Sequence, residues 1–208
     1  MKVLMLNGSP HEKGCTYTAL MEVAGELEKA GIETEIMHVG GDNVRGCMGC
    51  GACSKLGRCI WNEDKVNEAV EKLRESDGLV VGSPVHYASA GGAITSFLDR
   101  FFYSGSGYAA YKPAAAVASA RRAGTTATLD QLNKYFMISQ MPVVSSQYWN
   151  MVHGNSPEDV KKDGEGLQIM RVLGRNMAWM LQSIEAGKAA GVAAPEKEDV
   201  KMRTNFIR

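Results

Sequence analysis

Short apolar runs alternate with longer segments of helical periodicity along most of the chain. Two of the runs, at 2–6 and 78–82, are apolar without alternation, which is typical of strands covered on both faces of a sheet. Another run, at 33–39, alternates polar and apolar residues and indicates a strand nearer the sheet edge. The pattern predicts strands at 2–6, 33–39, 78–82, 114–118 and 143–146.

Between these runs, apolar residues recur at intervals of three and four, as on one face of a helix. Helices are predicted at 16–30, 64–76, 92–102, 126–139 and from 157 to about 190. The last helix has an inner stripe of Leu167, Met170, Leu173, Met177 and Leu181. This alternation implies βαβ units with right-handed crossovers. We therefore expect an α/β fold with a doubly wound, five-stranded parallel sheet and a long C-terminal helix.

No repeat or linker interrupts the alternation, so we expect one domain over 1–190, with a cysteine-rich insert at 44–62 and a charged tail at 191–208. In such sheets, ligands bind at the carboxyl ends of the strands, where the strand order reverses. The loops that follow the first, third and fourth strands are therefore the candidates for function.

Composition narrows the class of protein and its partners. The 208 residues are 45% hydrophobic and carry 23 basic and 23 acidic side chains, so no net field attracts nucleic acid or an anionic membrane. The opening MKVLMLNGSP lacks the long apolar region of a signal peptide, and no run reaches the length of a membrane span. We expect a cytoplasmic protein with no nucleic-acid and no membrane partner, whose five cysteines are reduced.

The segment 7–18 joins the first predicted strand to a helix and offers hydroxyls from Ser9, Thr16 and Thr18. Backbone N–H groups at a helix start bind anions, and hydroxyls add donors without adding charge. The segment lacks both the dinucleotide-binding G-x-G-x-x-G pattern and the G-K-S/T ending of a Walker loop. It predicts a phosphate site, with an ordinary N-capped turn as the alternative.

The segment 82–92 combines Pro84, His86 and Tyr87 with small residues. It can lay backbone amides along a flat heterocycle while an aromatic ring packs on that heterocycle; Tyr87 could instead be a core residue. After the predicted fifth strand, Tyr148 and Trp149 could wall the same pocket, or could pack on the last helix or in a subunit interface.

These two loops carry a family resemblance. NGSP followed by GCT, and GSPVHYASAGGAITSFLDR after the third strand, resemble the flavodoxin-like NAD(P)H-dependent FMN reductases over about residues 1 to 155. The resemblance implies a flavodoxin-like, FMN-binding domain that takes hydride from NAD(P)H. It implies that electrons pass to a quinone, flavin, nitro or azo compound, or iron–sulfur partner. We also expect a homodimer or homotetramer, for which the long C-terminal helix and tail are available. An electron carrier that does not react directly with NAD(P)H is the alternative.

By position, the resemblance puts the first loop around the FMN phosphate, 84–88 along the isoalloxazine and 119–124 at its pyrimidine end. It assigns no catalytic acid or base. Cys15 stands where relatives usually carry Asn, and His86 where they often carry Tyr. The residues assigned to the cofactor are Ser9, His11, Cys15, Thr16, Tyr17, Thr18, Pro84, Val85, His86, Tyr87, Ala88, Ser119, Arg121, Arg122 and Gly124.

Arg121 and Arg122 occupy a loop that is commonly glycine-rich in the relatives. One guanidinium could stabilise the negative charge of reduced FMN, because a nearby cation favours the anionic form. It could instead bind the 2′-phosphate of NADPH, which suits a planar guanidinium. A solvated loop is the alternative for both residues.

Four cysteines, Cys47, Cys50, Cys53 and Cys59, crowd into one short segment. The first three have the spacing of bacterial ferredoxins, so a [4Fe–4S] cluster is one interpretation. Structural zinc usually uses two separated pairs, and free thiols are the third alternative. The full spacing resembles that of the iron–sulfur flavoproteins, although many relatives with this pattern are FMN-only reductases. Because the segment leaves the second strand next to the first, we expect a cluster near the FMN of the same or a neighbouring subunit.

Overall fold

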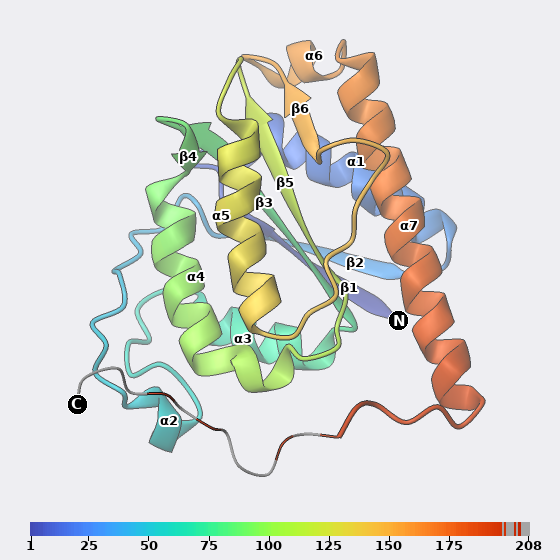
Figure 1. The fold of residues 1–208 in the computed structure, drawn as a ribbon. Helices are drawn as coiled ribbons and strands as arrows, with labels where there is room; N and C mark the ends of the chain where they lie inside the picture. The colour runs from blue at the N-terminus through green and yellow to red at the C-terminus, as the bar shows by residue number, and fades with distance from the viewer. Residues whose placement is uncertain (197, 199–201, 203, 205–208) are drawn as a thin grey trace.

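The sheet of the computed structural model, which describes residues 1–196, 198, 202 and 204, has the strand order β2-β1-β3-β5-β6 (Figure 1). A short strand, β4 (Ser89–Ala90), pairs antiparallel with β3. The prediction of a doubly wound sheet with five parallel strands is confirmed. These strands are β1 (Lys2–Asn7), β2 (Glu33–His38), β3 (Gly78–His86), β5 (Ala114–Ala120) and β6 (Met151–His153).

Helices cover both faces of the sheet (Figure 1). Val3 and Met5 pack into the core on one face, while Leu4 and Leu6 pack into the core on the other, because alternate strand residues point to opposite faces. The helices on the first face are α1 (Cys15–Lys29), α6 (Pro157–Val160) and α7 (Gly164–Ala189). Those on the second are α3 (Val66–Glu75), α4 (Gly92–Gly105) and α5 (Thr125–Ile138), with the 3-10 helix η1 (Ser106–Tyr108) after α4.

The fifth parallel strand lies later in the chain than predicted. At 143–146, the chain only touches the sheet: Val143 forms an isolated bridge with Ala114. Pro142 has no N–H to donate, and the hydroxyl of Ser146 is turned away to the carbonyl of Ile169 on α7, at 2.7 Å. Regular pairing resumes at Met151, so the predicted strand at 143–146 is wrong and Tyr148 and Trp149 precede the edge strand.

The C-terminal helical region is interrupted after its first turn. α6 ends at Val160, and α7 begins at Gly164 with Asp163 as its N-cap, whose Oδ1 accepts from the N–H of Gly166 at 2.9 Å. A single helix from 157 is therefore wrong, because this cap starts a new helix. The long C-terminal helix itself is confirmed, and part of the tail predicted at 191–208 lies outside the described residues.

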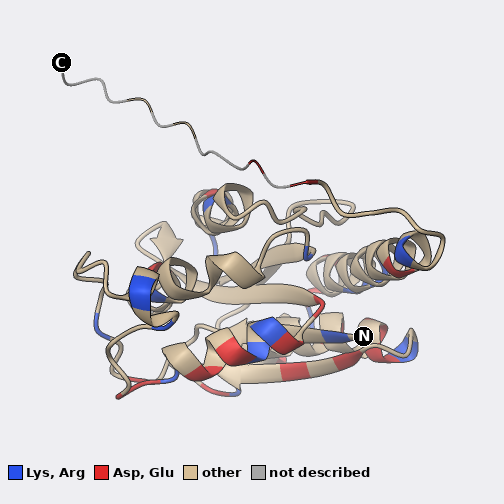
Figure 2. Ribbon diagram, turned by 90° about the horizontal axis from the view of Figure 1, so that it is seen from below, with Lys and Arg blue, Asp and Glu red and all other residues tan. Residues whose placement is uncertain are grey.

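Acidic and basic residues are interspersed along the outer elements, as Figure 2 shows. Glu35 of β2, for example, lies 2.7 Å from the Lys2 ammonium and 2.5 Å from that of Lys72 on α3. Within the described residues, no helix combines the length and apolar character that a membrane crossing requires.

The strand order reverses between β1 and β3, since the chain continues to β2 on one side and to β5 on the other. At such a point the loops after neighbouring strands turn to opposite faces of the sheet and leave a crevice between them. The loops after β1, β3 and β5 therefore meet at one edge of the sheet. The segment from Val39 to Lys65, which holds the four clustered cysteines, leaves β2 at the same edge.

Candidate functional site

The loop between β1 and α1 is closed by its own hydrogen bonds and leaves the helix start open. Asn7 is fully buried; its Oδ1 accepts from the N–H of Ser9 at 3.1 Å, and its Nδ2 donates to the carbonyl of Glu12 at 2.8 Å. The N-cap, Gly14, makes no side-chain cap, and no acidic residue lies in the first turn of α1. The first N–H groups of a helix with this arrangement are available to an anion.

The hydroxyls predicted to bind phosphate differ in whether their proton is already used in a hydrogen bond within the protein. The Ser9 hydroxyl accepts from the N–H of His11 at 3.1 Å and keeps its own proton for another acceptor. Thr18 donates its proton to the carbonyl of Gly14 at 3.1 Å. Thr16 is buried with its hydroxyl 2.7 Å from that of Ser119, so this pair shares one bond and joins the end of β5 to the first turn of α1.

The structure places the other three residues of the predicted phosphate loop in different surroundings. Cys15 directs its thiol at the carbonyl of Gly154, 3.7 Å away, and burial raises the pKa of this thiol. His11 is exposed and Tyr17 is half-buried. The loop is also covered from the β2 side, because a Cβ on Gly40 would lie 2.3 Å from the backbone of Gly8.

The predicted loop after β3 is a tight hairpin formed by the end of β3 and by β4. Val85 pairs with Ala90, and His86 with Ser89, which leaves Tyr87 (φ 49°) and Ala88 (φ 60°) at the tip. Left-handed φ at both central residues is the type I′ arrangement, which favours Asn and Gly. Two non-glycine residues there cost on the order of 1–3 kcal/mol each. Such strain is characteristic of binding sites.

Gln131 on α5 holds this hairpin in place. Its Oε1 accepts from the hydroxyl of Ser89 at 2.6 Å and from the N–H of Ala90 at 3.0 Å. At the tip, Tyr87 is wholly exposed, and His86 and Ala88 are exposed beside it. Neither Gln131 nor Asn7 was assigned from the sequence, because each acts through a contact that only the folded chain reveals.

The loop after β5 packs directly on the hairpin. Gly124 has φ 92°, and a Cβ there would lie 2.6 Å from the Cα of Ala88 and 2.8 Å from Val85 Cγ1. Arg121 and Arg122 are exposed in this loop, and the carbonyl of Arg122 lies 3.1 Å from Nε2 of His153 on β6. The segments predicted to line the isoalloxazine and its pyrimidine end therefore meet.

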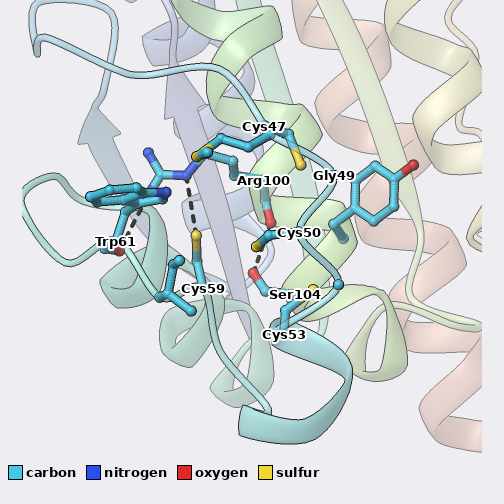
Figure 3. A pocket seen from close by; sticks show the side chains of 12 residues that line it. Cys47, Gly49, Cys50, Cys53, Cys59, Trp61, Arg100 and Ser104 are labelled. Atoms are coloured by element: carbon cyan, nitrogen blue, oxygen red, sulfur yellow. Dashed lines mark hydrogen bonds between the residues drawn. The ribbon is translucent and has the colours of Figure 1, made fainter.

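The four clustered cysteines line one pocket of about 140 Å³ against α4, together with Trp61, Arg100, Tyr103 and Ser104 (Figure 3). Cys47 and Cys50 are exposed, Cys53 and Cys59 half-buried, and none of the four is in a disulfide. Cys53 begins the short helix α2 (Cys53–Leu56). Among the described residues, no three His, Cys, Asp or Glu side chains are gathered in metal-binding geometry.

The expectation of a cluster near the FMN of the same or a neighbouring subunit stays a prediction, but the contact of this pocket with α4 was not foreseen. The pocket lies beside Arg100 and Ser104, and α4 begins at Gly92 just after the hairpin. At a rise of about 1.5 Å per residue, the pocket is roughly 12–18 Å along α4 from the hairpin. The residues nonetheless fit a sulfur-rich anionic group. Four thiols are a sufficient donor set for a [4Fe–4S] cluster, and the indole N–H of Trp61 is buried there without an acceptor.

Comparison with solved structures shows what kind of fold this is. RosB, solved with bound 8-demethyl-8-formylriboflavin-5′-phosphate, superposes with a TM-score of 0.70 at 18% identity, over 100% of this chain and 92% of that one. A flavodoxin from the domain Archaea superposes with a TM-score of 0.60 at 15% identity, over 88% and 99%. The fold is flavodoxin-like, as predicted.

Comparison of sequences is more specific. Residues 1–156 match the family described as NADPH-dependent FMN reductase. An iron–sulfur flavoprotein of Methanocaldococcus jannaschii is 31% identical over 193 residues, which are 89% of this chain and 100% of that protein. The chain belongs to the NADPH-dependent FMN reductase family, close to the iron–sulfur flavoproteins, and is a flavin-binding oxidoreductase.

Proposed function

We propose that the chain binds FMN at the carboxyl ends of β1, β3 and β5, accepts hydride from NAD(P)H there, and passes the two electrons to a second acceptor. FMN, when bound, supplies the hydride-accepting chemistry. The observation that carries the proposal is the uncapped start of α1 at the same edge of the sheet as the hairpin on which Gly124 packs. A terminal phosphate fits the former, and a flat ring fits the latter.

Each part of the site has a distinct task in this proposal. The N–H groups at the start of α1 and the Ser9 hydroxyl hold the phosphate. The hairpin tip and the loop at Arg121 and Arg122 orient the ring and leave its exposed side open to a nicotinamide and then to an acceptor. A quinone, a free flavin, a nitro or azo compound, or an iron–sulfur protein would suit such an open site.

Anaerobic mixing with NADPH and, separately, NADH tests the hydride step. The FMN-loaded protein should lose its yellow absorbance when NADPH or NADH is added and regain it when a quinone is added. The cofactor released from the purified protein should have the mass of FMN, with FAD absent. Loss of colour with dithionite but with neither nicotinamide would contradict hydride transfer and leave only FMN binding.

The pocket lined by four cysteines favours a second candidate function. In this one, a [4Fe–4S] cluster held by Cys47, Cys50, Cys53 and Cys59 carries single electrons away from the flavin, and the chain works as a two-centre electron carrier. The iron–sulfur flavoprotein name of the similar Methanocaldococcus protein supports it. The flavin of a carrier of this kind would stay oxidised with NADPH and NADH, so the same mixing experiment separates the two candidates.

A further inference from the structure

Cys59 is held by the protein in a way that the other three clustered cysteines are not. Its sulfur accepts from Nε of Arg100 at 3.3 Å, its N–H donates to Oδ1 of Asn67 at 2.9 Å, and its carbonyl accepts from Nδ2 of Asn67 at 3.1 Å. Within the described chain, the sulfurs of Cys47, Cys50 and Cys53 have no hydrogen-bond partner. One thiol of the set is therefore held by a side-chain hydrogen bond, and the other three are not.

Arg100 is the group that fixes it, and its own position is determined on every side. It is 2% exposed and forms a buried ion pair with Asp64. Its Nη1 also donates to the carbonyl of Arg45 at 3.3 Å, and its Nη2 to the carbonyl of Trp61 at 3.2 Å. The guanidinium thus ties α4 to both ends of the cysteine segment, as Figure 3 shows for Cys59 and Trp61.

A buried arginine directed at a thiol has a plain electrostatic consequence. Burying an ion pair contributes little net stability, so the charge is more easily explained by what it faces. A cluster held by thiolates is anionic, and its reduction potential rises with hydrogen bonds to its sulfurs and with nearby positive charge. A fixed N–H donor on one ligand acts in that direction.

We propose that Arg100 is a positioning residue that holds Cys59 as the preformed ligand of the cluster and raises the cluster's reduction potential. This inference rests on the proposed [4Fe–4S] cluster. It assigns to Asp64 the role of keeping the guanidinium oriented. It assigns no role in tuning the cluster to Arg45, because the side chain of Arg45 stacks 4.1 Å above the Trp61 ring and hydrogen-bonds no cysteine.

The test compares Arg100→Lys with the matched control Arg45→Lys in anaerobically reconstituted protein. Lysine keeps a positive charge opposite Asp64 but removes the Nε donor. Arg100→Lys should lower the equilibrium constant for one-electron reduction about tenfold, which is a shift of about 59 mV to more negative potential. Arg45→Lys should leave the potential unchanged. In metal-free protein, Arg100→Lys should also change the rate at which iodoacetamide alkylates Cys59, because the guanidinium that faces its sulfur is gone, and leave the rate at Cys47 unchanged.

If Arg100→Lys does not fold, the double variant Arg100→Gln with Asp64→Asn removes both charges together and leaves no lone charge buried. The same two measurements then apply, and the same shifts are expected. If the parent takes up iron but the Arg100 variants have the parent's reduction potential and the parent's rate of Cys59 alkylation, the inference is overturned and the proposed cluster is not. A parent that takes up no iron under these conditions overturns the proposed cluster, and the inference with it.

Discussion

Single side chains in the β1–α1 loop determine how much of the affinity for the FMN phosphate comes from side-chain hydroxyls and how much from backbone N–H groups. Ser9 keeps its proton free, whereas Thr18 has given its proton to Gly14. A hydrogen bond to a charged group is worth about 1.5–3 kcal/mol, so Ser9→Ala should weaken FMN binding roughly tenfold to a hundredfold. Thr18→Ala is the matched control and should leave the Kd, measured by flavin fluorescence quenching, nearly unchanged. Equal affinity in both variants would mean that the helix amides hold the phosphate alone.

Arg121 and Arg122 are exposed and hydrogen-bond nothing through their side chains among the described residues, so a bound ligand would decide their role. If a guanidinium stabilises reduced FMN, replacing the relevant Arg by Gln should lower the midpoint potential of the bound flavin, as a redox titration would show. If it binds the 2′-phosphate instead, only the KM for NADPH should rise and that for NADH should stay the same. No change in either measurement would mean that both residues are simply solvated side chains of the loop.

At the level of elements, the strands and helices were largely predictable because their apolar periodicity is local. Helix ends fell within a few residues of prediction, and β3 and α4 were expected on either side of the second loop. Two of the errors have long-range causes. β6 spans three residues, and its predicted position was displaced because Ser146 turns to α7. The hairpin, which was predicted as a cofactor-lining loop without strand pairing, is held by Gln131, about 40 residues further along the chain. Likewise, the cysteine spacing was visible in the sequence, but Arg100 behind Cys59 was not.

The contact between the hairpin and the loop after β5 is the packing most directly linked to cofactor binding. Gly124→Ala would put a Cβ 2.6 Å from the backbone of Ala88 at a left-handed φ. We expect a loss of about 1–3 kcal/mol in the free energy of unfolding and weaker FMN binding, since the hairpin must move. Gly25→Ala, in α1 with no atom within 4 Å of the new Cβ, should be neutral or stabilising. Urea titration and flavin binding of both variants check this; parent-like FMN affinity in a folded Gly124→Ala protein would contradict it.

The ion pairs that join β1, β2 and α3 make a pH-dependent contribution to stability. Hydrogen bonds from Lys2 and Lys72 lower the pKa of Glu35. A carboxyl with a lowered pKa adds stability above its ordinary pKa, and that stability is lost as the pH falls through the folded-state value. Glu35→Gln should therefore reduce the free energy of unfolding at pH 7, by up to about 1 kcal/mol for pairs this close to solvent. The difference from the parent should shrink as urea titrations are repeated toward pH 3; a constant difference would point to packing instead.

At the scale of the whole molecule, the two candidate functions differ in whether electrons leave through the cysteine pocket. If the four clustered cysteines hold a [4Fe–4S] cluster, protein purified without oxygen should be brown and contain about four irons per chain. Because the pocket lies well along α4 from the hairpin, replacing any one of the four by Ala should remove the iron and leave FMN bound. Cys15 lies outside the segment, and its thiol is directed at the carbonyl of Gly154. Cys15→Ala is therefore the matched control and should keep its iron. Iron and flavin assays on the five variants decide the matter. If anaerobic protein supplied with iron and sulfide stays yellow and iron-free, the four residues are thiols, and the FMN-only reductase is the function that remains.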